Sequence, residues 1–336
     1  MNQDPIYPTS APRVAVVGAT GLVGKMLLQI LEERHFPVAQ LLPLAGPNSL
    51  GKRIHFRGKA CSVEQASSAS FEGLDLVFFA ASGELSRNLA PLAVKAGARV
   101  IDKSSTWRLD PSVPLVVPEV NGELIQADTT LVASPNCTTT GLVMALQPLH
   151  QAAGLRRVQV TTLQAASGAG RAALQELFDQ ESSAAKGQVP TAQHWPAVLA
   201  GNVLPLCDRL EHDGSSAEEH KLLHETRKIM GLPELELMAT CTRVPVAVGH
   251  GASVWVETER ELSCVEARAA LSGFPGVRLT EQSSALDVAG SDEVLVGRLR
   301  RPLAGSGIQF WQVSDNLRKG AATNAVQIAE LMLKLN

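Results

Sequence analysis

The chain has 336 residues, 45% of them hydrophobic, and a formal net charge of −3 at pH 7. This length suits two domains with enough apolar side chains for a large core. The nearly balanced charge excludes a strongly basic nucleic-acid binder and disfavours binding to an anionic membrane. Apolar runs such as LDLVFFAA are too short to span a bilayer, and the polar start MNQDPIYPTSAP lacks a signal-peptide pattern. We therefore expect a cytoplasmic protein.

The five cysteines are odd in number and scattered along the chain, and no two of them form a C-x-x-C pair. This usage is typical of a protein from a reducing compartment. It predicts neither a disulfide framework nor a metal site.

Strands and helices alternate in the first part of the chain. The apolar run 14–17 ends at Gly18, and the residues that follow have the apolar spacing of a helix. Three further strands are expected, at residues 39–45, 75–81 and 98–104. A helix over 82–97 precedes the last of them. This alternation predicts an α/β fold with a Rossmann-type, doubly wound parallel sheet, which we place at residues 11–135.

The pattern changes after residue 135. Strand-like segments are separated by longer loops and helices, at residues 156–164, 236–248, 252–260, 277–280 and 293–299. Ser215 and Ser216, followed by Glu218 and Glu219, mark the start of a helix. We predict an α+β domain over 136–315 with an open, largely antiparallel sheet. A helix within 316–336 is expected to pack back on the first domain.

A glycine motif, GATGLVG, lies between the first strand and the first helix. Gly18, Gly21 and Gly24 leave room for the backbone to approach a pyrophosphate, whose charge would lie at the helix N-terminus. This context predicts a nicotinamide dinucleotide cofactor. The end of the second strand normally separates NAD from NADP by an acidic or a basic side chain. Here it offers Asn48 and Ser49, so the sequence leaves both cofactors open.

Cys137 follows the sequence SPN and precedes an apolar helical run. The N-terminus of a helix stabilises a thiolate there, although a single cysteine is more often an inert core residue. Downstream, Arg243 and His250 occur in RVPVAVGHGASVWVE. Cysteine, histidine and arginine together form a plausible site with a nucleophile, a base and an anion-binding group.

Eight stretches in order resemble the aspartate-semialdehyde dehydrogenase family: GATGLVG, VIDKSSTWR, PLVVPEVN, SPNCTT, QAASGAG, EEHKLLHETRKI, RVPVAVGH and DNLRKGAATNAVQIAE. The resemblance implies that the second domain is a catalytic and dimerisation domain and that the chain forms a homodimer. It also implies a role in amino-acid biosynthesis, with a small-molecule substrate and phosphate as ligands.

The resemblance also implies roles for individual residues. Cys137 would be the nucleophile, His250 the general acid and base, and Gln164 the residue that orients the thioester. Arg243 would hold the substrate carboxylate and Glu218 its ammonium group. Arg108 and Lys221 would hold phosphate, and Asn136 would also belong to the substrate- and phosphate-binding residues. The predicted cofactor-binding residues are Gly18, Thr20, Gly21, Leu22, Val23, Gly24, Asn48, Ser49, Ser82, Ser167, Gly168 and Asn316.

The implied reaction begins when the Cys137 thiolate attacks an aldehyde and His250 takes the proton. Hydride then passes to the nicotinamide, and phosphate displaces the sulfur of the resulting thioester to give an acyl phosphate. Because both the thiolate and the histidine must exchange protons, activity is expected to fall in acid.

The chain departs from the family pattern at a few positions. Asn48 stands where the family has an arginine for the NADP 2′-phosphate, Lys103 stands where it has an asparagine, and Leu163 stands where it has a tyrosine. Two alternatives therefore remain open. One is a paralogue for another semialdehyde or acyl phosphate, such as N-acetylglutamyl phosphate. The other is a non-catalytic dimer that binds nucleotide.

Overall fold

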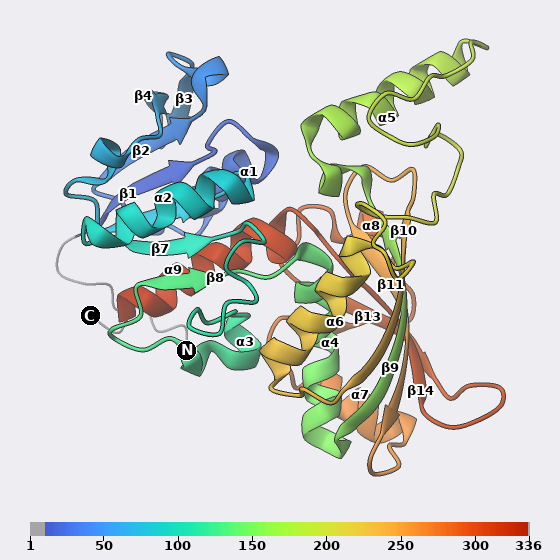
Figure 1. The fold of residues 1–336 in the computed structure, drawn as a ribbon. Helices are drawn as coiled ribbons and strands as arrows, with labels where there is room; N and C mark the ends of the chain where they lie inside the picture. Colours follow the sequence, from blue (N-terminus) through green and yellow to red (C-terminus); the bar gives the residue numbers. More distant parts are fainter. Residues whose placement is uncertain (1–10, 335–336) are drawn as a thin grey trace. The chain divides into compact units, whose positions relative to one another are not determined.

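A computed structural model describes residues 11–334, which form two compact units (Figure 1). The first unit takes the described residues up to Pro135 and those from Ala321 onward, and the second spans Asn136–Gly320. Each unit contains one six-stranded sheet. In the described part of the chain, no helix has the length and apolar character needed to cross a membrane.

The sheet of the first unit is parallel throughout, with strand order β5-β2-β1-β6-β7-β8. Its strands are β1 (Arg13–Val17), β2 (Gln40–Ala45), β5 (Glu64–Gln65), β6 (Leu76–Phe79), β7 (Arg99–Asp102) and β8 (Leu131–Ala133). The central strands are continuous apolar runs because both of their faces are buried. Val14 and Val16 join one hydrophobic cluster, whereas Ala15 and Val17 join the other.

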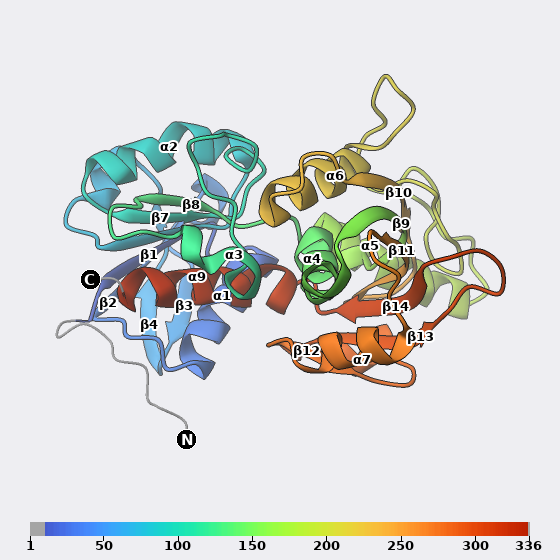
Figure 2. The same cartoon turned by 90° about the horizontal axis from the view of Figure 1, so that it is seen from below.

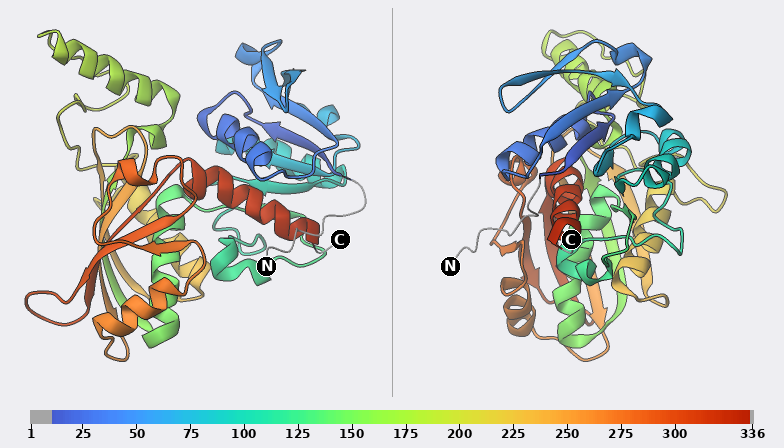
Figure 3. Two further views of the ribbon diagram at one scale, coloured as in Figure 1. Left: turned by 180° about the vertical axis from the view of Figure 1, so that it is seen from behind. Right: turned by 90° about the vertical axis from the view of Figure 1, so that its left-hand side faces the viewer.

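Helices cover both faces of this sheet (Figure 2). The helix α2 (Gly83–Lys95) packs on one face, and α1 (Leu22–Glu33) packs on the other together with α9 (Thr323–Lys334). The last helix, red in Figure 3, lies along the sheet and is tied to α1 by an ion pair of 2.7 Å between Arg34 and Glu330. Smaller elements complete the unit: α3 (Pro118–Asn121) and the hairpin of β3 (Arg53–Phe56) and β4 (Lys59–Ser62).

The second unit has a mixed sheet with strand order β10-β9-β11-β14-β13-β12. Its strands are β9 (Leu155–Gln164), β10 (Glu236–Arg243), β11 (His250–Thr258), β12 (Val277–Leu279), β13 (Val294–Arg300) and β14 (Ile308–Ser314). The helices α4 (Cys137–Ala153), α6 (Ala217–Met230) and α7 (Cys264–Ser272) lie on one face (Figure 2). The remaining helices are α5 (Arg171–Ala185) and α8 (Ala285–Val288). Together the two units confirm the predicted fold class.

The register of this sheet gathers polar side chains at one end. Strands β9 and β10 run parallel, so their last residues, Gln164 and Arg243, are direct neighbours. Strand β11 runs antiparallel to β9, and its residue Gly251 faces Leu163. Its first residue, His250, therefore starts at the same end of the sheet.

Three details of the predicted second sheet are wrong. The strand predicted over 236–248 ends at Arg243, because the next segment contains Pro245 and bonds to another loop through the carbonyls of Val246 and Ala247. The strand β14 was not predicted, since buried Gln312 and Ser314 interrupt its apolar alternation. The sheet is also more mixed than predicted, because β9–β10 and β12–β13 are parallel pairs.

Candidate active site

Cys137 is the first residue of α4, and Asn136 is the N-cap of that helix. The Asn136 side-chain oxygen accepts the N–H groups of Thr138 at 2.8 Å and Thr139 at 3.3 Å. This cap fixes the first turn of a 17-residue helix, whose positive dipole end lies at the Cys137 sulfur. Gly320 lies against the side chain of Cys137. A Cβ atom added at Gly320 would lie only 3.0 Å from Cys137 Cβ. A helix N-terminus is a position at which proteins commonly stabilise a thiolate.

The two buried cysteines of this unit are poor nucleophiles. Burial raises the pKa of the Cys207 thiol to about 12, and it also raises the pKa of the Cys241 thiol. Both thiols therefore stay protonated at neutral pH.

Glu218 joins three of the predicted site residues. One carboxylate oxygen accepts Asn136 Nδ2 and Gln164 Nε2, both at 2.9 Å, and the other accepts Lys221 Nζ at 3.1 Å. Burial alone would raise the pKa of Glu218, but the Lys221 charge and these donors together lower it. The carboxylate is therefore ionised, and it orients the N-cap beside Cys137.

Two acidic residues that the sequence analysis missed support this network. The side chain of Glu225 accepts the backbone N–H of Asn136 at 2.7 Å, and Asp208 accepts Lys221 Nζ at 2.6 Å. Burial acts to lower the pKa of Lys221, but the two carboxylates raise it. Glu225 lies two helical turns after Glu218, so the spacing of seven residues on one helix face was the available signal.

The peptide of Ala165 holds both Arg243 and His250. Its N–H donates to His250 Nδ1 at 3.0 Å, and its carbonyl accepts Arg243 Nη1 at 2.7 Å. Both side chains are buried, yet within residues 11–334 neither Arg243 Nε nor His250 Nε2 has a hydrogen-bond partner. A Cβ atom at Gly168 would lie 2.9 Å from His250 Nε2 and 3.1 Å from Arg243 Nη1. The two side chains therefore leave polar edges for a ligand near Gly168.

The hydrogen bond to His250 decides which ring nitrogen carries the proton. Because Nδ1 accepts from Ala165, the neutral ring has its proton on Nε2. Burial, and then the charge of Arg243, hold the pKa of His250 well below its ordinary range. The neutral imidazole thus presents an N–H donor to the site.

We expect His250 to stay neutral while the pH is lowered through about 6.5, the ordinary pKa of a histidine. Its folded-state pKa lies below the unfolded value of about 6.5, so the unfolded chain binds the extra proton first. The free energy of unfolding should therefore fall as the pH drops through that value. NMR of histidine-labelled protein checks this, with the His250→Asn variant for assignment. A His250 signal that titrates near 6.5 contradicts it.

Three predicted cofactor-binding residues also lie in the second unit. Asn316 Nδ2 donates to Ser167 Oγ at 2.9 Å, and Asn316 Oδ1 accepts the N–H of Gly249 at 2.9 Å. This links the turn that carries Ser167 and Gly168 to the residue before His250.

Arg108 and Lys103 lie in the first unit and bind the segment that leads to Cys137. Arg108 donates to the carbonyls of Ser134 at 3.1 Å and of Lys103 at 2.7 Å. Lys103 Nζ donates to Ser134 Oγ at 3.2 Å and to the Pro135 carbonyl at 2.8 Å. The lysine at this unusual position therefore fixes the residue that precedes Asn136.

The remaining predicted cofactor residues surround the glycine turn of the first unit. Gly18 has a φ of 87°, and a Cβ there would lie 2.2 Å from the Ala80 carbonyl oxygen. Gly21 is the N-cap of α1 and supplies no side-chain acceptor, while Leu22, Val23 and Gly24 form the first turn. Thr20 Oγ1 lies 3.1 Å from Ser49 Oγ, which brings the end of β2 to this turn. Ser82 instead caps α2, where it accepts the N–H of Leu85.

This arrangement fits a dinucleotide. The turn is too close to the Ala80 carbonyl, just after β6, for any side chain at Gly18, and the first N–H groups of α1 have no side-chain cap, so they suit an anion. Asn48 and Ser49 lie in the 3₁₀ turn η1 (Pro47–Ser49) after β2, where the adenine ribose binds in folds of this kind.

Two family models match the chain. Residues 13–128 match the semialdehyde dehydrogenase NAD binding domain, and residues 146–319 match the semialdehyde dehydrogenase dimerisation domain. Aspartate-semialdehyde dehydrogenase of Aquifex aeolicus is 46% identical over 333 residues, covering 96% of this chain and 98% of that protein. The enzyme of the same name from Bacillus subtilis is 42% identical, with the same coverage of both proteins. The crystal structure of aspartate semialdehyde dehydrogenase II from Vibrio cholerae, complexed with ASA, is 40% identical with a TM-score of 0.93, covering 96% and 98%.

Proposed function

Because the chain belongs to the aspartate-semialdehyde dehydrogenase family, we propose that it interconverts L-aspartate 4-semialdehyde plus phosphate and L-aspartyl 4-phosphate in amino-acid biosynthesis. The family predicted from the eight motifs is thereby confirmed. The observation that carries the proposal lies within the second unit. Cys137 stands at a capped helix N-terminus, and Arg243 Nε and His250 Nε2 have no hydrogen-bond partner in the described chain. Neither alternative, the other acyl phosphate or the non-catalytic dimer, has comparable support.

Cys137 acts as the nucleophile in this proposal. Its sulfur attacks the aldehyde carbon, so a C–S bond forms and the carbonyl oxygen becomes an alkoxide. The dipole of α4 and the Asn136 cap keep the sulfur ionised beforehand. When phosphate later attacks the thioester carbon, the C–S bond breaks and the sulfur leaves as the same stabilised thiolate.

His250 serves as a hydrogen-bond donor to the oxygen that gains charge. Its neutral ring carries the proton on Nε2. The Nε2–H group stabilises the alkoxide by donating a hydrogen bond to it. The role expected from the sequence is that of a base that takes a proton. In this proposal Nδ1 already accepts the Ala165 N–H, so His250 begins the reaction as a hydrogen-bond donor through Nε2. Gln164 is held by Glu218 beside the same end of the sheet and orients the thioester.

Charged side chains bind the two ends of the substrates. Arg243 is suited to the α-carboxylate because, in the described chain, its buried Nε–H has no hydrogen-bond partner and can donate to a ligand. Glu218 is ionised and suits the ammonium group. Lys221, which is partly exposed beside Glu218 and Asp208, and Arg108 of the first unit are the groups proposed for phosphate.

The glycine turn would hold the cofactor's pyrophosphate at α1, and Asn48 and Ser49 would lie at its adenine ribose. The cofactor, when bound, exchanges hydride with the carbonyl carbon of the substrate. Neither an acidic side chain nor an arginine stands at the end of β2, so we propose that the chain uses both NAD and NADP.

We expect an arginine at position 48 to favour the 2′-phosphate. In the Asn48→Arg variant, a charge-assisted hydrogen bond should tighten binding of 2′,5′-ADP by about tenfold or more, and leave 5′-AMP unchanged. Titration calorimetry of the intact protein measures both. Asn48→Gln is the uncharged control. Equal gains for the two nucleotides contradict the assignment of Asn48 to the ribose.

We also propose a homodimer formed through the second unit, in a reducing cytoplasm. The face of its sheet away from α4, α6 and α7 carries a cavity lined by Gln159, Thr161, Ser253 and Trp255, among others. The match to a dimerisation domain over residues 146–319 supports an interface formed by this unit, and we propose that this face forms it. Sedimentation of the wild type and of a Thr161→Lys variant tests it, because a buried added charge should produce monomers.

The proposed reaction is tested by following the reduced nicotinamide spectroscopically. Turnover of L-aspartate 4-semialdehyde should require inorganic phosphate and should occur with NAD and with NADP. Turnover of N-acetylglutamate semialdehyde in its place would support the first alternative. A folded protein that binds nucleotide but turns over neither aldehyde would support the second.

A further inference from the structure

An aromatic ring covers one face of Arg243. The guanidinium carbon lies 5.4 Å from the centre of the Trp195 ring, within the range of a cation–π contact. Arg243 itself is only 6% exposed. A ring on the face of a guanidinium leaves the N–H groups at its edge unobstructed, because those donors lie in the guanidinium plane. Nη1 is already bonded to the Ala165 carbonyl, and Nε remains open.

Trp195 is fixed from its own side. Its indole N–H donates to the carbonyl of Ala173 in α5 at 3.2 Å. Its ring packs against a small hydrophobic cluster made of Ala166, Leu177, Leu199 and Leu204. The tryptophan is thus held by α5 and by the residues around it, although it lies in a segment without regular secondary structure.

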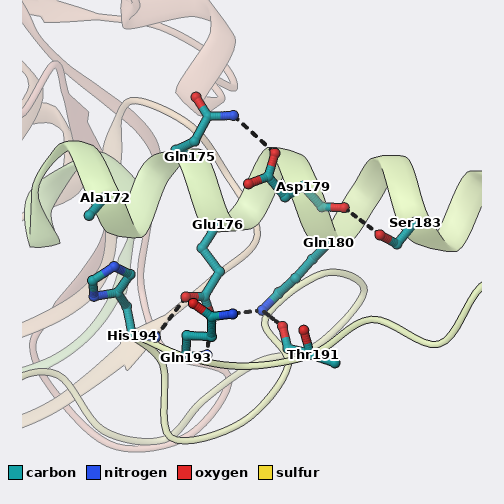
Figure 4. Close-up of a pocket in the computed structure, with 9 residues that line it drawn as sticks. All are labelled: Ala172, Gln175, Glu176, Asp179, Gln180, Ser183, Thr191, Gln193 and His194. Atoms are coloured by element: carbon teal, nitrogen blue, oxygen red, sulfur yellow. Dashed lines mark hydrogen bonds between the residues drawn. The ribbon is translucent and has the colours of Figure 1, made fainter.

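Two side chains of α5, Glu176 and Gln180, hold the backbone on either side of Trp195. Figure 4 shows them beside the residues that precede the tryptophan. Glu176 accepts the N–H groups of Gln193 at 2.9 Å and His194 at 2.6 Å. Gln180 donates to the Thr191 carbonyl at 3.0 Å. Its oxygen accepts the N–H groups that follow the tryptophan, those of Leu199 at 2.9 Å and Ala200 at 3.1 Å.

These bonds leave little freedom to the segment. Glu176 and Gln180 are themselves buried and are joined by a hydrogen bond of 3.0 Å. Burial acts to raise the pKa of Glu176, but the backbone donors of residues 193–195 outweigh it and lower the pKa. A charged carboxylate that accepts several backbone N–H groups holds a loop more firmly than neutral pairs do.

We propose that Trp195 is a positioning residue that fixes the plane of Arg243 and thereby sets the specificity for a substrate with an α-carboxylate, and that Glu176 and Gln180 hold Trp195 in place. The inference deepens the proposed function, because it gives Arg243 a defined orientation toward the carboxylate. Without the ring, the guanidinium keeps its bond to Ala165 but can turn about it, so its open edge is no longer directed at one place.

The experiment compares Trp195→Leu and Trp195→Phe with the wild type, using L-aspartate 4-semialdehyde and phosphate. In Trp195→Leu, KM for the semialdehyde should rise by about twofold to thirtyfold, which corresponds to the loss of a cation–π contact. Both kcat and KM for phosphate should stay near the wild-type values, because the contacts described for Trp195 join it to Arg243, Ala173 and a hydrophobic cluster. Trp195→Phe keeps an aromatic face and should show a smaller rise.

A second pair of variants tests how the loop is held. Glu176→Gln replaces an acceptor of backbone N–H groups by a group that also donates, so it should give the same rise in KM for the semialdehyde. Gln175→Ala is the matched control, since Gln175 is exposed on the same helix and bonds only to Asp179 in the described chain. Its kinetics should equal those of the wild type.

The outcomes separate this inference from the proposed function. If the wild type shows no phosphate-dependent turnover, the proposed function itself is overturned. If the wild type is active and Trp195→Leu has an unchanged KM, or if kcat and both KM values fall or rise together, Trp195 has no specific effect on Arg243. If Trp195→Leu does not fold, the Trp195→Phe and Glu176→Gln kinetics give the answer.

Discussion

Replacing Cys137 by alanine is expected to lower kcat by at least about 10⁴-fold, because the reaction loses the atom that carries the acyl group. The free energy of unfolding should hardly change, since Asn136 still caps α4 through its own side chain. The measurement is the rate of nicotinamide reduction with semialdehyde and phosphate, together with urea denaturation of both proteins. In the wild type, rapid quenching without phosphate should trap a covalent thioester on Cys137.

The matched control is Cys264→Ala. Cys264 is likewise the first residue of a helix, α7, with a serine N-cap, but it does not belong to the site described above. Its replacement should leave kcat unchanged. A Cys137→Ala variant that keeps more than about a hundredth of the wild-type rate would exclude covalent catalysis by this residue.

Replacing Glu218 by alanine is expected to lower the free energy of unfolding by about 3–5 kcal/mol, because two buried amides lose their acceptor and Lys221 keeps only Asp208. Activity should fall as well, since Asn136 and Gln164 lose their orientation. Glu218→Gln retains the shape and one acceptor oxygen, so its loss of stability should be smaller. Urea denaturation of the three proteins at neutral pH gives these differences.

The effect should also depend on pH. The pKa of Glu218 is lower in the folded protein than in the unfolded chain, so its contribution is complete above the unfolded value of about 4.3. It is lost as the pH falls through the folded-state pKa, and the wild type and the variants should then converge. Glu234→Ala, at an exposed position of the same unit, is the control and should change stability by less than about 0.5 kcal/mol. An equal loss in Glu218→Ala and Glu234→Ala would contradict the network.

Local signals predicted the elements that position the site. The sequence predicts a helix that starts after SPN, and α4 starts at Cys137 with Asn136 as its N-cap. Ser216 and Glu219 read as a capping box, and α6 begins with one. These features depend on residues three or four positions apart, so the sequence contains all the information that they need.

Interactions between distant segments could not be predicted in this way. The Ala165 peptide, which holds Arg243 and His250, has a side chain that gives no sign of a function. Trp195 lies 48 positions before Arg243 in a segment with no periodicity, and only the bonds from α5 bring it over the guanidinium. Any residue type can supply a backbone N–H or carbonyl, so such contacts leave no pattern.

The sequence by itself determined the two-part α/β and α+β organisation, the family, and the residue types for a nucleophile, an anion clamp and a cofactor turn. The reason is that hydrophobic periodicity, helix caps and glycine turns act over a few residues. The tertiary structure decided the proton position on His250, the ionised state of Glu218 and the ring over Arg243. Each of these depends on burial and on a partner from another strand or helix, and both arise only when the chain is packed.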